Sequence, residues 1–190
     1  MARTDSEIID RLVSRAQAGD RAAFSQLVRL TMNDVVALTY RMTGDRDAAR
    51  DLAQDTFISA WEKIDGFRGE ARFENWLYRI ASNKALNHLA GEKSHRTESL
   101  DGDTTAEPAA SPDGSPDVML QREQLREGVL AFMQTLPPQQ RAVFDLRFYR
   151  QLSFDEIAKV TGKAVGTVKT HYREAVAKLR LFAIEKGWAS

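Results

Sequence analysis

Residues 152–180 constrain the fold of this chain more than any other stretch, because they predict two short helices joined by a tight turn. Ser153 and Glu156 have the spacing of a capping box, in which each side chain accepts a hydrogen bond from the backbone amide of the other residue. Gly162 supplies a left-handed turn that a residue with a Cβ resists, and Thr167 is predicted to cap the second helix. The apolar positions of that helix keep helical spacing: Val168, Tyr172, Ala175, Val176 and Leu179. The pattern is typical of a helix-turn-helix.

The second of these helices is basic on its outer face, which carries Lys169, Thr170 and Arg173. Between residues 163 and 186, six Lys or Arg side chains stand against two acids. A helix in the major groove of DNA needs cations for phosphates and short polar side chains for base edges. The alternative is a solvated face on an ordinary helical hairpin. Because cap, turn, spacing and charge coincide, we favour DNA contact.

The chain of 190 residues is 43% hydrophobic, formally neutral and free of cysteine. This composition is typical of soluble globular protein, and it excludes disulfides and thiolate zinc sites. We find no signal peptide and no membrane-spanning run, so we expect a cytoplasmic protein. The three histidines lack metal-ligand spacing, and no glycine-rich nucleotide loop follows a strand. We therefore expect no enzyme activity, no metal or cofactor and no small-molecule substrate.

The neutral total hides a segregation of charge along the chain. Residues 68–96 are rich in Arg and Lys, whereas residues 97–117 hold six acids and no Lys or Arg. The segment 93–117 is rich in Asp, Ser, Thr, Pro and Gly and cannot bury enough apolar surface to fold alone. We predict a flexible acidic linker there, between a domain at residues 1–92 and a domain at residues 118–190.

Helical spacing runs through both domains, so we predict an all-α fold. In the first domain, one helix ends near Gly19, Asp20 caps a second that stops at Gly44, and a third occupies residues 45–65. The face of this third helix opposite its apolar stripe is mainly acidic, and solvation is its simplest interpretation. The second domain is predicted to hold four short helices, with Pro137-Pro138 ending the first and starting the next.

A loop with interleaved aromatic and cationic residues begins at Gly66 and leads into a further helix. Aromatic rings can stack on unpaired bases while Arg and Lys hold the backbone. Trp76, Leu77 and Ile80 are predicted to be core, which leaves Phe67, beside two glycines, as the better candidate for touching a base. On the helix that follows, two asparagines four residues apart either read a base edge or face water: Asn83 and Asn87.

Taken together, these residues resemble a bacterial RNA polymerase sigma factor of the extracytoplasmic-function group of the sigma-70 family. In the first domain, the motifs that carry the resemblance are residues 49–57 (ARDLAQDTF), 67–69 (FRG) and 76–83 (WLYRIASN). In the second domain, they are residues 136–138 (LPP), 141–144 (RAVF), 156–158 (EIA) and 165–169 (VGTVK). The motifs occur in order and cover most of the chain outside the linker.

The resemblance implies a non-enzymatic specificity subunit that binds core RNA polymerase and promoter DNA. Its clamp-binding helix corresponds here to Asp51, Gln54 and Asp55. Its pocket for a base flipped from the −10 element corresponds to Phe67, Ile80, Asn83 and Asn87. The residues expected to hold the adjoining strand are Arg68, Arg72, Arg79, Lys84 and Lys93. Those expected to read the −35 element in the major groove are Lys163, Thr167, Lys169, Thr170, His171 and Arg173.

The resemblance also implies that the acidic linker occupies the basic RNA path of the polymerase, and that an anti-sigma factor holds the chain inactive. Three residues depart from the pattern, since many relatives carry a basic residue in place of Ala90, His171 and Glu174. An acid at Glu174 either repels phosphate or accepts a hydrogen bond from a cytosine amine. The alternative function is a stand-alone dimeric helix-turn-helix regulator, which would leave the aromatic loop and the linker without a role.

Overall fold

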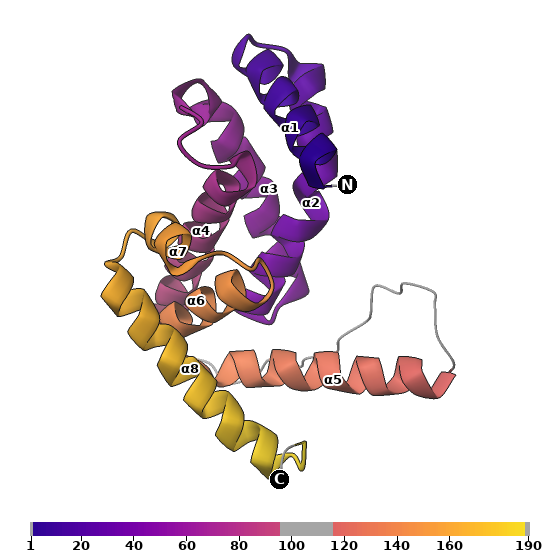
Figure 1. The fold of residues 1–190 in the computed structure, drawn as a ribbon, viewed down its shortest axis with the longest axis vertical. Helices are drawn as coiled ribbons and strands as arrows, with labels where there is room; N and C mark the ends of the chain where they lie inside the picture. The colour runs from indigo at the N-terminus through magenta and orange to yellow at the C-terminus, as the bar shows by residue number, and fades with distance from the viewer. Residues whose placement is uncertain (1, 96–115, 189–190) are drawn as a thin grey trace.

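The computed structural model describes residues 2–95 and 116–188, and every regular element in these two ranges is a helix (Figure 1). The first domain consists of α1 (Ala2–Gln17), α2 (Arg21–Thr43), α3 (Arg46–Lys63), the short 3-10 helix η1 (Ile64–Gly66) and α4 (Phe73–His95). The second consists of α5 (Pro116–Thr135), α6 (Pro138–Phe148), α7 (Phe154–Thr161) and α8 (Val165–Glu185). The predicted all-α architecture of two domains is confirmed. Most of the predicted linker, residues 96–115, lies outside the described residues.

The helix ends of the first domain follow local capping chemistry. The Asp20 carboxylate accepts hydrogen bonds from the amides of Ala22 and Ala23, at 2.9 and 3.0 Å, and so starts α2. Gly44 ends that helix in the left-handed conformation, with φ of 77°. Asp45 then caps α3 through the amide of Ala48 at 2.8 Å. These short-range signals place α2 and α3 as an antiparallel pair.

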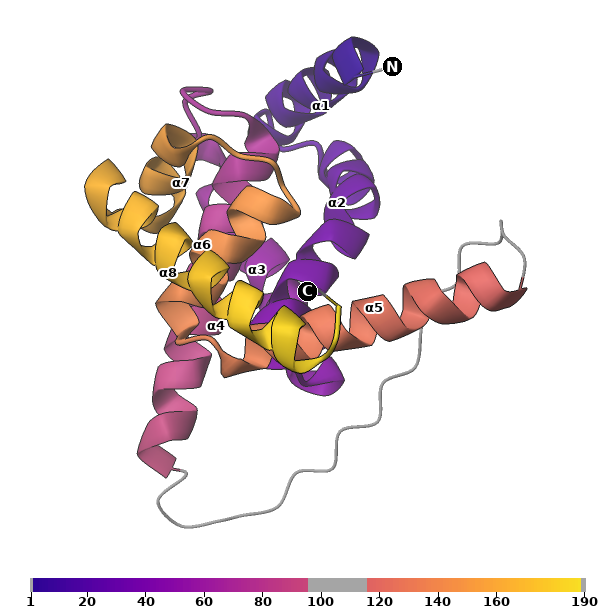
Figure 2. The same ribbon diagram turned by 60° about the horizontal axis from the view of Figure 1, so that its bottom comes forward.

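The core of the first domain lies where α2 packs between α1, α3 and α4. Its largest fully buried side chains come from α2, η1 and α4: Leu27, Leu38, Met42, Ile64, Phe73 and Leu77. In the second domain, a separate smaller cluster forms where α5 and α6 meet the middle of α8: Phe132, Met133, Leu136, Phe144 and Ala175. The other buried apolar residues of α6, α7 and α8 join the cluster of the first domain: Val143, Leu146, Ile157, Val160 and Val168. Helix α5 projects from the body in both views (Figure 2).

The helix-turn-helix is formed by α7 and α8. Ser153 and Glu156 form the predicted capping box, and Gly162 ends α7 with φ of 68°. The predicted cap of the second helix was wrong: α8 begins at Val165 with Ala164 as its N-cap, and no side chain caps it. The reason is that Ala164 returns to an extended conformation directly after the turn, so that helix resumes before Thr167. Thr167 lies exposed in the first turn of α8.

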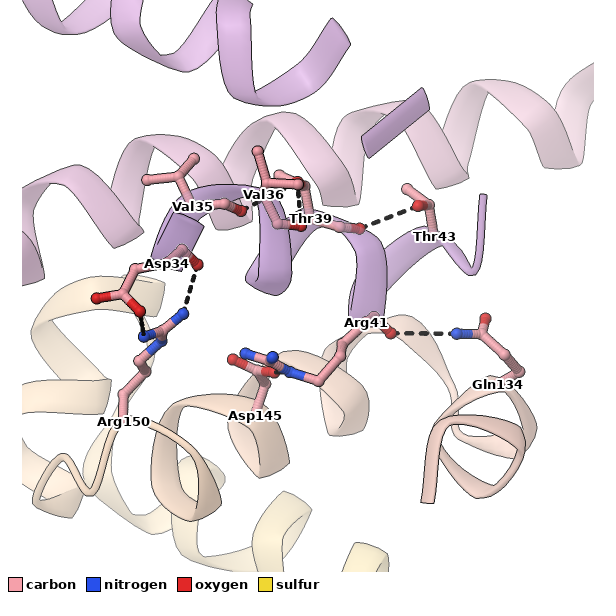
Figure 3. A network of polar contacts seen from close by, with 9 residues as sticks. All are labelled: Asp34, Val35, Val36, Thr39, Arg41, Thr43, Gln134, Asp145 and Arg150. Carbon is pink, nitrogen blue, oxygen red and sulfur yellow. Dashed lines mark hydrogen bonds and ion pairs between the residues drawn. The ribbon is translucent and has the colours of Figure 1, made fainter. Parts of the chain in front are cut away.

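A buried ion pair joins the two domains (Figure 3). Asp145 of α6 is fully buried and accepts a hydrogen bond from Nε of Arg41 on α2. Next to it, Arg150 forms an ion pair with the carboxylate of Asp34 at 2.6 Å and also donates to the Asp34 carbonyl. Burial raises the pKa of Asp145, and the two guanidinium groups oppose that rise. Two cations thus lie close to the buried Asp145 carboxylate: Arg41 of the first domain and Arg150 of the second.

Further polar contacts cross the same interface. Gln134 of α5 donates to the Arg41 carbonyl at 3.1 Å, and Arg141 of α6 donates to the carbonyl of Met42. On the side of α4, Asn75 donates to the Glu156 carboxylate of α7 at 3.2 Å. The joint between the domains therefore combines charged and hydrogen-bonded groups with apolar packing, because buried residues of α6 and α7 such as Leu146 and Ile157 belong to the same hydrophobic cluster as the first domain.

We predict opposite outcomes for two alanine substitutions in the helix-turn-helix. Gly162→Ala places a Cβ on a left-handed backbone, which costs about 1 kcal/mol in free energy of unfolding. Gly166→Ala, within α8, is expected to leave stability unchanged or to raise it by up to about 1 kcal/mol. An added Cβ meets no atom within 4 Å at either position, so packing does not contribute. Urea unfolding measures both values, and equal effects would contradict the assignment of strain to the turn.

Candidate nucleic-acid interface

Phe67 lies in the loop between η1 and α4, with its ring half-buried against two other aromatic rings. The ring meets Phe73 edge-on at a centroid distance of 5.9 Å and Trp76 at 5.3 Å. Such tilted pairs are favourable because the edge of one ring meets the face of another. The cluster holds the Phe67 ring partly open to solvent, which is the condition for stacking on an incoming base.

This ring lines an open pocket of about 870 Å³ at the base of the loop. The loop and α4 supply most of the wall, including Arg68, Arg72 and Arg79. Arg72 is paired with Glu74 at 2.7 Å, which reduces its charge toward the pocket. The remaining wall comes from α7 of the second domain: Glu156, Lys159 and Val160. The pocket is therefore shared between the two domains.

A second open pocket of about 470 Å³ continues along α4. It is lined by residues from successive turns of that helix, and two residues from α3 complete it: Trp76, Arg79, Ile80, Asn83, Lys84, Asn87, Ser59 and Lys63. Trp76 and Arg79 belong to both pockets, so the two form one continuous surface. Asn83 and Asn87 are exposed on it.

Every residue predicted for the −10 element lines this surface, except Lys93, whose side chain lies outside the described residues. Sequence reasoning missed several contributors to this surface. Trp76 was predicted to be core but is half-buried and lines both pockets, Ser59 and Lys63 come from α3, and α7 supplies a further part of the wall. Lys63 adds a cation suited to phosphate.

On α8, the predicted −35 residues form an outward face. Thr167, Lys169 and Arg173 are exposed, and Lys163, Thr170 and His171 are partly exposed. The Thr170 hydroxyl donates to the Gly166 carbonyl one turn earlier at 3.0 Å, which keeps its oxygen lone pairs outward. The face thus presents cations and short polar groups from the first turns of a helix, as groove reading requires.

Glu174 does not project freely from that face. Its carboxylate accepts a hydrogen bond from the Gln140 side chain of α6 at 2.6 Å, and Lys178 donates to the oxygen of the same amide at 2.9 Å. Glu174 and Lys178 of α8 thus both form hydrogen bonds with the Gln140 side chain of α6. We infer that Glu174 ties α8 to α6.

The acidic residues of α3 line neither of the two pockets. Asp51, Gln54 and Asp55 are exposed, and Ile58 beside them is 52% exposed. In the described part of the chain, no group of three or more His, Cys, Asp or Glu could hold a metal ion. No described helix is long and apolar enough to cross a membrane.

Comparison of the sequence with protein families gives two matches: Sigma-70 region 2 over residues 27–95 and Sigma-70, region 4 over residues 126–179. The chain is 36% identical over 179 residues to the RNA polymerase sigma-H factor of Pseudomonas aeruginosa, with 88% of this chain and 91% of that protein covered. It is 35% identical over 174 residues to the ECF RNA polymerase sigma-E factor of Escherichia coli, with 87% and 90% covered.

Two solved structures are also similar. CnrH in complex with the cytosolic domain of CnrY aligns with a TM-score of 0.66 and 26% identity, covering 94% of this chain and 98% of that one. The sigma factor RpoE of Bartonella quintana, in complex with the anti-sigma factor NepR, aligns with a TM-score of 0.67. Its identity is 22%, with 84% and 95% covered, and the likeness is one of fold.

We predict that Glu174→Ala lowers the free energy of unfolding by about 1 kcal/mol, because the largely buried Gln140 amide loses its acceptor. Glu174→Gln keeps an acceptor oxygen and is expected to cost less than about 0.5 kcal/mol. Glu185→Ala, at an exposed position further along α8, serves as the control. Urea unfolding checks all three, and equal losses from Glu174→Ala and Glu185→Ala would rule out the tie to α6.

Proposed function

The chain belongs to the extracytoplasmic-function group of the sigma-70 family, and we propose how its surfaces divide the work of starting transcription. As a sigma factor it is a non-enzymatic subunit that directs RNA polymerase to promoters for specific initiation. The stand-alone dimeric regulator is set aside, because the family matches cover both domains. We further propose that the protein acts in the cytoplasm, where polymerase and DNA meet.

We assign capture of the −10 strand to the continuous surface of the two pockets on α4 and its preceding loop. The observation that carries this assignment is that one ring, two amides and several cations gather on one surface: Phe67, Asn83, Asn87, Arg68, Arg72, Arg79 and Lys84. Unstacking a base costs a few kcal/mol. Stacking on an aromatic ring returns about 1–3 kcal/mol per base, and the amides can bond the base edge. The free-energy cost of unstacking the base is therefore nearly offset by its contacts with this surface, without ATP.

The outward face of α8 is assigned to the −35 element. Lys163, Lys169 and Arg173 would contact phosphates, and Thr167, Thr170 and His171 lie where base edges are read. The exposed residues Asp51, Gln54 and Asp55 of α3 are assigned to core polymerase. Support for this assignment comes from the membership of the chain in the sigma-70 family, whose members bind core polymerase, and from the exposure of all three side chains.

The packed arrangement of the two domains cannot serve both promoter elements at once. Lys159 lines the same pocket as Phe67. Lys163 lies four residues further along the chain and is therefore within about 15 Å of Lys159. Elements centred about 25 base pairs apart are separated by roughly 85 Å of duplex. We propose that the described arrangement is a resting state, and that the domains separate when polymerase binds.

A protein partner is proposed to favour this resting state. Support comes from the related CnrH, whose structure in complex with the cytosolic domain of CnrY aligns over 94% of this chain. A partner that contacts both domains would be an anti-sigma factor. By holding the −10 pocket against α7, it would keep the Phe67 surface from a DNA strand.

We predict that Phe67→Ala and Asn83→Ala each slow strand opening by about tenfold or more, because each removes a contact with the captured base. Opening is followed by permanganate reactivity of the −10 region with core polymerase present. Asn33→Ala, an exposed asparagine on α2, is the matched control. Unchanged opening in both variants, with core polymerase still bound, would refute the assignment.

We predict that Arg150→Ala weakens the joint between the domains by roughly tenfold, since a charge-assisted contact contributes about 1.5–3 kcal/mol. The chain lacks cysteine, so Ser25→Cys and Ala177→Cys provide a specific pair of dye sites, one per domain. Energy transfer between the dyes should fall in the Arg150→Ala protein. Arg29→Ala, an exposed arginine on α2, should leave transfer unchanged. Equal transfer in all three proteins would show that Arg150 does not hold the joint.

A further inference from the structure

The backbone of the loop that carries Phe67 is unpacked at its two glycines, although the Phe67 ring itself packs on Phe73 and Trp76. Its two glycines, Gly66 and Gly69, have no atom within 4 Å of the position of an added Cβ. One backbone hydrogen bond, from the Phe67 amide to the Ile64 carbonyl at 3.0 Å, closes the turn. Because glycine gains more conformational freedom than other residues when it is released, such a loop needs an external anchor to hold one shape.

Gln17, near the start of the first domain, supplies that anchor. Its side-chain nitrogen donates to the carbonyl of Ile64 at 3.0 Å and to the carbonyl of Phe67 at 2.7 Å. These partners are 47 and 50 residues away along the chain. A primary amide has two N–H donors, and here both are used on the turn that presents the Phe67 ring.

The donor itself is held in place by a rigid element. Gln17 is the last residue of α1, and the preceding turns of that helix are buried through Leu12, Val13 and Ala16. Helix α1 precedes the region 2 match, which begins at residue 27. A segment outside the matched region thus fixes the backbone of a residue inside it.

We propose that Gln17 is a positioning residue for −10 strand capture, holding the Phe67 backbone so that its ring stands open to an unstacked base. This inference rests on the proposed role of Phe67. It assigns to α1 a part in promoter opening, exerted through two carbonyl groups without contact to DNA. If Gln17 served only the stability of the fold, its loss would affect every activity of the first domain alike.

The test separates hydrogen-bond donation from side-chain size. Gln17→Glu keeps the shape but replaces the donor with an acceptor that repels both carbonyls, whereas Gln17→Lys restores a donor. Each variant, with core polymerase, is measured for binding to a single-stranded −10 oligonucleotide and for opening of a duplex promoter carrying 2-aminopurine in the −10 element. Affinity for core polymerase and the midpoint of thermal unfolding are measured alongside. Gln26→Glu, at an exposed position on α2, is the matched control, and Phe67→Ala tests the underlying role.

We expect Gln17→Glu to weaken oligonucleotide binding and to slow opening by about five- to tenfold, with core affinity unchanged. For Gln17→Lys, oligonucleotide affinity and the rate of opening should stay within about twofold of those of the unsubstituted chain, and Gln26→Glu should leave both unchanged. Equal losses in the Glu and Lys variants, or a loss of core binding together with opening, would overturn the inference. If Phe67→Ala impairs opening but Gln17→Glu does not, the inference falls and the role of Phe67 stands. If Phe67→Ala has no effect, the base-capture proposal itself fails.

Discussion

The arrangement of this protein depends on a carboxylate buried between two domains. Asp145 is wholly out of water, and such a group is tolerated only when cations and donors meet it. Arg41 crosses from α2 and donates to Oδ1 of this carboxylate, and Arg150 returns the other way to Asp34. Breaking the joint exposes these charges, which water solvates well. It also exposes apolar side chains, because buried residues of α6 and α7 belong to the same hydrophobic cluster as the first domain, and their burial opposes separation.

The joint and the DNA surfaces are linked by shared residues. Helix α7 forms one wall of the pocket beside Phe67, and its own turn leads into the reading helix α8. The position of the second domain therefore decides how much of the α4 surface a strand can reach. On the proposed assignments, the interface between the domains thus connects the surface for promoter opening with the surface for groove reading.

Local chemistry made much of the fold predictable from the sequence. The capping box at Ser153 and the left-handed turn at Gly162 each depend on contacts between residues no more than four positions apart. The gathering of Phe67, Ile80, Asn83 and Asn87 followed from helical spacing and a family resemblance. Contacts between distant segments were not predictable. No spacing rule relates Arg41 to Asp145, which are 104 residues apart, or Gln17 to Phe67. The prediction that Thr167 caps α8 was wrong because the preference of threonine for cap positions is weak, and the helix already begins at Val165.

The two carboxylate oxygens of Glu156 have different partners. Oε2 accepts from the amide and the hydroxyl of Ser153, both at 2.8 Å, while Oε1 accepts from Asn75 of the other domain at 3.2 Å. The first pair survives when the domains part, so α7 keeps its cap in either arrangement. A change at Glu156 disturbs both roles together, whereas a change at Asn75 removes the contact across the joint and leaves the capping box in place. The helix-turn-helix can therefore keep its local structure while the strength of the joint changes.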